Sequence, residues 1–174
     1  MLHADVEPEP HWVNKLIAQL LKYHADVVSV VVPVKNVFGL TSTAVDGYTT
    51  GGNLRRLCMR EVVELPETFS AADLKTERAL LVNTGCWICD FTKPWVENVC
   101  FTVQDVVAKG TDGKWRAGVV PEDWNFSRDL HSWGCRVFAT RAVKVAHRGT
   151  GEWGNQTPWG LWQRDKEYFA NGGV

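Results

Sequence analysis

The sequence lacks the features that mark membrane-spanning, secreted and nucleic-acid-binding chains. Its 19 Lys and Arg residues nearly balance its 20 Asp and Glu residues, for a net charge of −1, so binding to nucleic acid through bulk charge is not expected. No apolar run approaches the roughly 20 residues of a membrane-spanning helix. The start at Met1 has neither the basic nor the apolar segment of a signal peptide. We therefore expect a cytoplasmic protein without a nucleic-acid partner or a transmembrane segment.

Cysteine is sparse and does not pair evenly. The five cysteines lie in apolar, strand-like stretches, at Cys58, Cys86, Cys89, Cys100 and Cys135, which predicts reduced thiols in the core. Cys86 and Cys89 form a single CxxC, whereas a structural zinc site usually has a second pair of ligands at close spacing. No helix start follows Cys86, as a thioredoxin-like motif would require. Zinc binding and redox catalysis are therefore less favoured than packing.

What is present suits one folded domain. With 174 residues, 45% of them hydrophobic, the chain can bury a sizeable core. We assign residues 1–149 to this domain and residues 150–174, rich in Trp and Gly, to a C-terminal tail of the same domain. Residues 151–162 mix Trp, Gly, Asn and Gln without a period, which predicts a loop. Aromatic and amide side chains in a loop serve equally to bind sugars or to pack on a core.

The spacing of apolar residues predicts the order of the elements. Apolar residues recur with a period near 3.6 in residues 11–23, which predicts an amphipathic helix. Residues 27–34 are almost all β-branched, which predicts a strand buried on both faces, as in a sheet covered by helices. The remaining predictions are strands at 79–83, 86–89, 99–107, 136–139 and 143–146, a strand pair or irregular segment at 54–63, a weak helix at 71–78, a short helix or turn at 92–97 and a hairpin turn at 111–114.

A second helix is predicted after Pro121. Glu122 and Asp123 are adjacent carboxylates in its first turn, apolar residues follow at helical spacing, and Gly134 stands where the helix should end. A carboxylate at a helix N-terminus is stabilised by the helix dipole and lies at the edge of the core. Taken alone, this pattern is that of an ordinary helix start, with Asp123 as a cap.

Taken in order, these pieces resemble the C-terminal half of a family-two glycosyltransferase of the GT-A fold. In that family a strand ends in a DxD motif, a glycine turn precedes the acceptor region, an xED motif opens a helix beside the acceptor, and a late strand ends in a histidine. The corresponding positions here are Asp5 for the last acid of DxD, Thr84 and Gly85 for the glycine turn, Glu122 and Asp123 for xED, and His147 for the histidine.

The resemblance implies an α/β fold, with a partial GT-A-like mixed sheet flanked by helices in three layers. It implies Mn²⁺ or Mg²⁺ held by Asp5 and His147, with His3 as a further ligand, and a nucleoside diphosphate sugar as donor beside Thr84 and Gly85. Asp123 would be the general base for a glycan or other hydroxyl acceptor, oriented by Glu122. Hard oxygen ligands with one imidazole suit such an ion, and a carboxylate at a helix start suits a base.

The chain departs from the family pattern in two ways. It has His3-Ala4-Asp5 where the family has Asp-x-Asp, so an imidazole replaces one carboxylate. It also begins at this motif, so we expect that the half that binds the nucleotide either has been lost, leaving a short or incomplete enzyme, or comes from a partner chain or from a second copy in a homo-oligomer. The alternatives to an enzyme are a carbohydrate-binding module that uses the tryptophan-rich tail, and an oligomeric protein that pairs through an exposed sheet edge.

Overall fold

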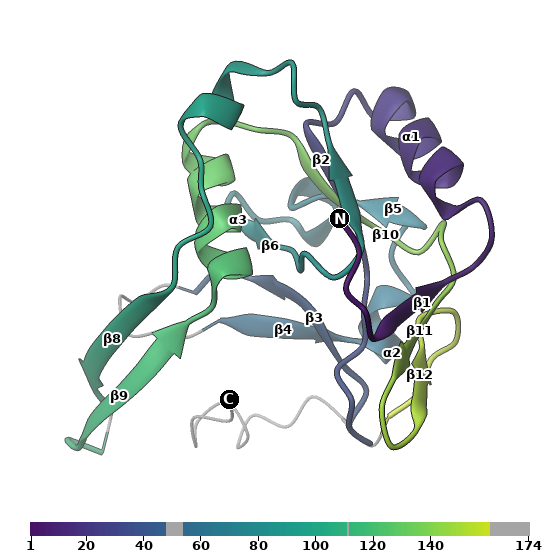
Figure 1. The fold of residues 1–174 in the computed structure, drawn as a ribbon. Helices are drawn as coiled ribbons and strands as arrows, with labels where there is room; N and C mark the ends of the chain where they lie inside the picture. The colour runs from purple at the N-terminus through teal and green to yellow at the C-terminus, as the bar shows by residue number, and fades with distance from the viewer. Residues whose placement is uncertain (48–53, 111, 161–174) are drawn as a thin grey trace.

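The computed structural model describes residues 1–47, 54–110 and 112–160. These residues form a mixed α/β fold that is mostly strand (Figure 1). The helices are α1 (Trp12–Lys22), α2 (Met59–Val62) and α3 (Glu122–Ser132), with 3₁₀ turns η1 (Ala72–Leu74) and η2 (Pro94–Glu97). The strands are β1 (Val6–Pro8), β2 (Val27–Val30), β3 (Leu40–Val45), β4 (Arg55–Cys58), β5 (Thr68–Phe69), β6 (Leu80–Leu81), β7 (Trp87–Cys89), β8 (Gln104–Lys109), β9 (Trp115–Val120), β10 (Val137–Thr140), β11 (Val145–Arg148) and β12 (Glu152–Gly154).

Within these ranges the strands form four small sheets, in the orders β5-β10-β2-β7, β1-β11-β12, β4-β3-β6 and β8-β9. Among the strand pairs of the described residues, only β2–β10 is parallel. The predicted α/β class is confirmed, but the strands are divided among several sheets and do not form one mixed sheet between two helix layers. Pro33 gives a physical reason why β2 does not continue into a larger sheet, because proline has no backbone N–H to donate to a strand ladder. β2 ends at Val30, and Pro33 makes only an isolated bridge to Thr41 of β3.

β2 is buried on both faces, as its composition predicts. Val28 packs in one core cluster with Leu16 of α1, whereas Val27 packs in another with Phe126 and Leu130 of α3. All five side chains are at most 2% exposed. The alternation of side chains along the strand therefore places α1 and α3 against opposite faces of the sheet that contains β2.

α3 begins and ends where the sequence predicts. Pro121 is its N-cap residue, and Gly134 follows the helix with φ at +69°, a conformation that glycine adopts without strain. The Oγ of Ser127 accepts a hydrogen bond from the backbone N–H of Val82 (3.0 Å). The amide of Asn125 donates to the carbonyl of Thr102, just before β8 (2.8 Å). These bonds fix the helix to the residue that follows β6 and to the segment that precedes β8.

Several sequence predictions need correction. The strand predicted at 99–107 is β8, which starts at Gln104, and residues 54–63 form β4 followed by the short helix α2. The weak helix predicted at 71–78 is only the 3₁₀ turn η1, and the predicted loop 151–162 contains β12. Here tertiary pairing decides the structure, since β12 is held by its ladder with β11. Residues 161–174 of the predicted tail lie outside the described residues.

The cysteine prediction holds only in part. All five thiols are free, and Cys58 and Cys86 are buried, but Cys100 is exposed. Burial raises the pKa of the Cys86 thiol to about 11, and that of the half-buried Cys89 to about 11 as well. Both CxxC thiols therefore stay protonated at neutral pH. None of the described helices combines the length and the apolar character needed to cross a bilayer.

Candidate functional site

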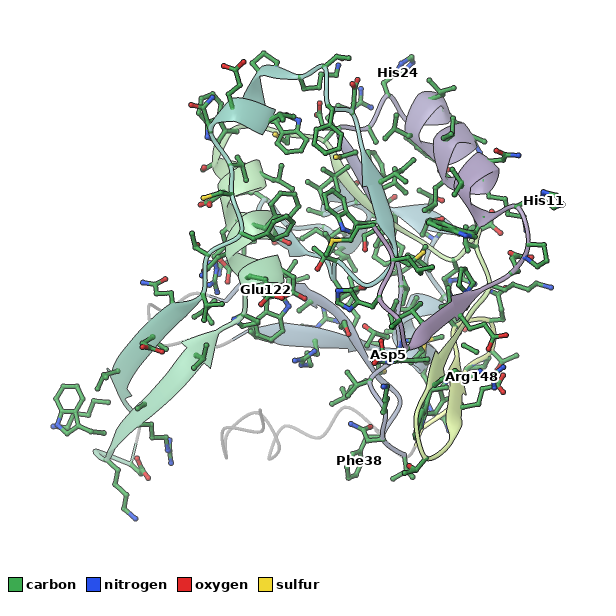
Figure 2. All side chains as sticks on the ribbon, viewed as in Figure 1. Asp5, His11, His24, Phe38, Glu122 and Arg148 are labelled. Carbon is green, nitrogen blue, oxygen red and sulfur yellow. The ribbon has the colours of Figure 1, made fainter. Side chains whose placement is uncertain are left out.

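The structure brings together two residues from opposite ends of the chain. β1 pairs antiparallel with β11, with Val6 opposite His147, so that Asp5 lies beside the His147 ring. The Oδ2 of Asp5 is 3.3 Å from Nε2 of His147. The backbone N–H of Arg148 donates to the Asp5 carbonyl (2.7 Å), which fixes the turn before β1. Figure 2 shows Asp5 at the start of β1, with Arg148 on the adjoining strand β11.

The His147 ring is oriented by a backbone carbonyl. Its Nδ1 lies 2.7 Å from the oxygen of Pro33, which can only accept a hydrogen bond, so Nδ1 carries the proton. Nε2 therefore faces Asp5 with either a lone pair or a second proton. A hydrogen bond from the other ring nitrogen to a backbone carbonyl is the usual arrangement around a metal-binding histidine.

Lys35 is the third member of this cluster, and sequence reasoning missed it. Its Nζ is 2.6 Å from the same Asp5 Oδ2 that faces His147. The hydrogen bond from Lys35 is the main cause that lowers the pKa of Asp5, and the charge of His147 acts in the same direction. Lys35 and His147 thus both contact the same oxygen of Asp5. A lone lysine after a buried strand carries no sequence signal strong enough to assign it.

His3, Thr84 and Gly85 form a neighbouring turn. The backbone N–H of His3 donates to the carbonyl of Gly85 (2.7 Å), and the Asn83 side chain accepts from the Gly85 N–H (2.9 Å). Thr84 and Gly85 are buried, whereas His3 is exposed. A Cβ placed on Gly85 would lie 3.0 Å from Asn83 Oδ1 and 3.6 Å from Nδ1 of His3. Gly85 thus allows the N-terminal segment to pack closely on this turn.

The three predicted metal ligands do not all converge. Within the described ranges no three His, Cys, Asp or Glu side chains form a group that could hold a metal ion, so His3 does not complete a set with Asp5 and His147. The Asp5–His147 pair supplies one carboxylate and one imidazole, so an ion such as Mg²⁺ or Mn²⁺ would need the rest of its shell from substrate phosphates and water. The Lys35 ammonium competes for the same Asp5 oxygen.

Asp123 is half-buried in the first turn of α3. Burial, assisted by the adjacent charge of Glu122, raises its pKa to about 6; the Trp124 amide and the Arg56 guanidinium act in the opposite direction. Its Oδ1 is buried without a hydrogen-bond partner in the described part of the chain, and the N-cap position of α3, Pro121, has no side-chain cap. Asp123 therefore lies in the first turn of the helix and is not the N-cap residue itself.

Asp123 and the Asp5–His147 pair are not in direct contact, but a short series of interactions connects them. Nδ1 of His147 is bonded to Pro33, and Pro33 bridges to Thr41 of β3. Arg56 of β4 donates to the Thr41 carbonyl (3.1 Å). Its guanidinium lies 4.6 Å from the centre of the Trp124 ring, beside Asp123.

An open cavity of about 770 Å³ lies on the β12 side of the molecule. Its lining includes Trp153, Trp159, Gln156 and Arg60. Trp153 is opposite His147 in the β11–β12 ladder, so the two side chains share a face of that sheet. A Cβ placed on Gly149 would lie 3.1 Å from Lys35 and 3.3 Å from Trp153. Trp153 thus lines the cavity and lies near Gly149 and Lys35, but Lys35, Asp5 and His147 are not among the residues that line the cavity.

Comparison with models of protein families, with curated proteins and with solved structures finds no match for this chain.

Proposed function

We propose that this protein is a nucleotide-sugar-dependent glycosyltransferase of a GT-A-like type, which transfers a sugar to a hydroxyl acceptor with the help of a divalent metal ion. The observation that carries the proposal is the Asp5–His147 pair, built from two segments 142 residues apart. Three further features support it: the cationic Lys35 on the same carboxylate, the glycine turn that holds the N-terminal segment, and the half-buried Asp123.

Asp123 is the residue that would accept a proton. Its pKa of about 6 leaves it mostly ionised at neutral pH but more basic than an ordinary carboxylate. As the acceptor oxygen forms its bond to the anomeric carbon, the bond from that carbon to the phosphate oxygen breaks. The nucleoside diphosphate leaves with the electron pair, and the hydroxyl proton passes to Asp123. Glu122, on the adjacent position, raises the pKa of Asp123 and would orient the acceptor.

Asp5 and His147 would hold the metal ion, Mn²⁺ or Mg²⁺. When bound, the ion supplies positive charge that neutralises the leaving diphosphate. Asp5 provides a hard oxygen ligand, and His147 presents Nε2 because Pro33 fixes its Nδ1 proton. Lys35, whose Nζ is 2.6 Å from the same Asp5 oxygen, would have to move off that oxygen for the ion to bind, and its charge would then lie beside the diphosphate. The buried turn of Thr84 and Gly85 supports this end of the donor site.

The proposal is tested by turnover. The full chain is incubated with a panel of nucleotide sugars and Mn²⁺, and released nucleoside diphosphate is measured. We expect release for at least one donor, with a loss of at least about 100-fold in kcat for Asp123→Asn, which removes the base. The matched control is Asp129→Asn, which removes a carboxylate from the same helix. No release with any donor, or equal release by the two variants, would reject the proposed base.

A carbohydrate-binding role without catalysis is the second candidate, and the cavity beside β12 favours it. Trp153 and Trp159 line that cavity together with Gln156 and Arg60, which supplies stacking surfaces and hydrogen-bond donors. The indole N–H of Trp159 is already bonded to the Gly154 carbonyl (2.8 Å), so its ring is fixed in place. This role predicts glycan binding without metal that Trp153→Ala abolishes and Asp123→Asn leaves unchanged, as measured on a glycan array.

A further inference from the structure

The β8–β9 hairpin extends away from the rest of the fold (Figure 1). Its two strands form a sheet of their own, and isolated two-stranded sheets are only marginally stable in water. One end is anchored, since Val120 packs in the cluster of Trp124 at the start of α3. The hairpin nevertheless holds three large apolar side chains that are at least 61% exposed, Val107, Val119 and Trp115.

The register of the ladder places these three residues on one face. Asp105 is opposite Val119, Val107 is opposite Ala117, and Lys109 is opposite Trp115. Opposed residues of an antiparallel pair lie on the same face, and so do residues two apart along a strand. We call these six residues the outer face of the hairpin. Val120, which contacts the core, lies on the other face.

The outer face has opposite charges at its two ends. Asp105 is at the base of the hairpin and Lys109 is near its tip, with Val107 midway between them. Neither charged residue has an ion-pair partner among the described residues. Along β8 the outer face therefore carries an acidic, an apolar and a basic residue at equal spacing. Two such faces are complementary in charge when one is turned end to end relative to the other.

We propose that the outer face binds the outer face of a second copy of this chain, with the two hairpins antiparallel about Val107. This orientation brings Asp105 of each copy next to Lys109 of the other and buries the apolar residues between them. In the parallel orientation β8 of one copy would lie over β9 of the other, so Asp105 would face Val119 and Lys109 would face Trp115, and the charges would stay unpaired. Six residues cover less than the roughly 800 Å² per partner of a standard interface, so the dimer is expected to be weak and concentration-dependent.

A charge-reversal series tests the proposal by sedimentation velocity over a range of protein concentrations. Wild type should shift toward dimer as concentration rises. Asp105→Lys and Lys109→Asp should each weaken dimerisation by at least about tenfold, because each creates two like-charge contacts. The double variant, Asp105→Lys with Lys109→Asp, should restore it, since the charges are complementary again. A double variant as weak as the single ones would overturn the proposal.

A second pair of variants tests the apolar contact. Val107→Lys places a charge at the centre of the interface and should abolish the dimer. Leu21→Lys, on α1, changes a residue that is 64% exposed and should have no effect. Both sites are exposed, so the fold should survive, as checked by far-UV circular dichroism. A wild-type chain that stays monomeric at millimolar concentration would exclude self-association. A dimer that is lost on Leu21→Lys and kept on Val107→Lys would place the interface elsewhere, and either result would overturn the proposal.

Discussion

Replacing Asp123 with Asn should stabilise the folded protein at neutral pH. The native pKa of this carboxyl is raised from 3.8 to about 6 by burial and by Glu122. Between these two values the folded chain binds more protons than the unfolded chain, so stability falls as pH rises through this window and is level above it. The full shift corresponds to at most about 3 kcal/mol at neutral pH. Because the carboxyl is only half-buried, solvent screening reduces our expectation to about 1–2 kcal/mol.

The assay is urea unfolding of the wild type and the Asp123→Asn variant at pH 4 and pH 7.5. The amide cannot ionise, so the variant should gain about 1–2 kcal/mol over the wild type at pH 7.5 and a few tenths at pH 4. Asp129→Asn, near the other end of the same helix, is the control for removing a carboxylate from α3. The reasoning is refuted if Asp123→Asn is destabilising at pH 7.5, or if its advantage does not change with pH.

Two further predictions concern the cluster around Asp5. Lys35→Met should raise the pKa of Asp5, because the Lys35 hydrogen bond is the main cause that lowers it; a carboxyl titration by NMR that shows no change would contradict this. Gly85→Ala should destabilise the fold by about 1–3 kcal/mol, because the added Cβ lies 3.0 Å from the Asn83 side chain. Gly118→Ala, whose Cβ comes no nearer than 3.9 Å to another residue, should be neutral, and equal melting temperatures for the two variants would disprove the packing argument.

Local patterns predicted the elements that bury one clear apolar face. The helical periodicity of α1 and α3 and the β-branched run of β2 each predict the structure that the element forms in the folded chain. The division into four sheets was not predictable in this way, because it depends on which short strands pair across the chain. β12, for example, exists through its ladder with β11, within a segment that has no strand-like alternation.

The candidate site shows the same limit. The resemblance to family-two glycosyltransferases pointed to Asp5 and His147, and the β1–β11 pairing places them together. Lys35 and Arg56 were missed because each acts through a single long side chain whose neighbours come from distant segments. His3 was named as a ligand from its position two residues before Asp5, but its backbone is bonded to the Gly85 turn and its side chain joins no group of metal ligands among the described residues.

The most direct test of the central claim is a thermal unfolding measurement with Mn²⁺ and a nucleoside diphosphate, alone and together. We predict that the two ligands together raise the melting temperature of the wild type more than the sum of their separate effects, because the metal links the diphosphate to Asp5 and His147. The Asp5→Ala, His147→Ala double variant should lose this increase, whereas Asp123→Asn should keep it. An increase that persists in the double variant, or no increase with any nucleoside diphosphate, would contradict the claim.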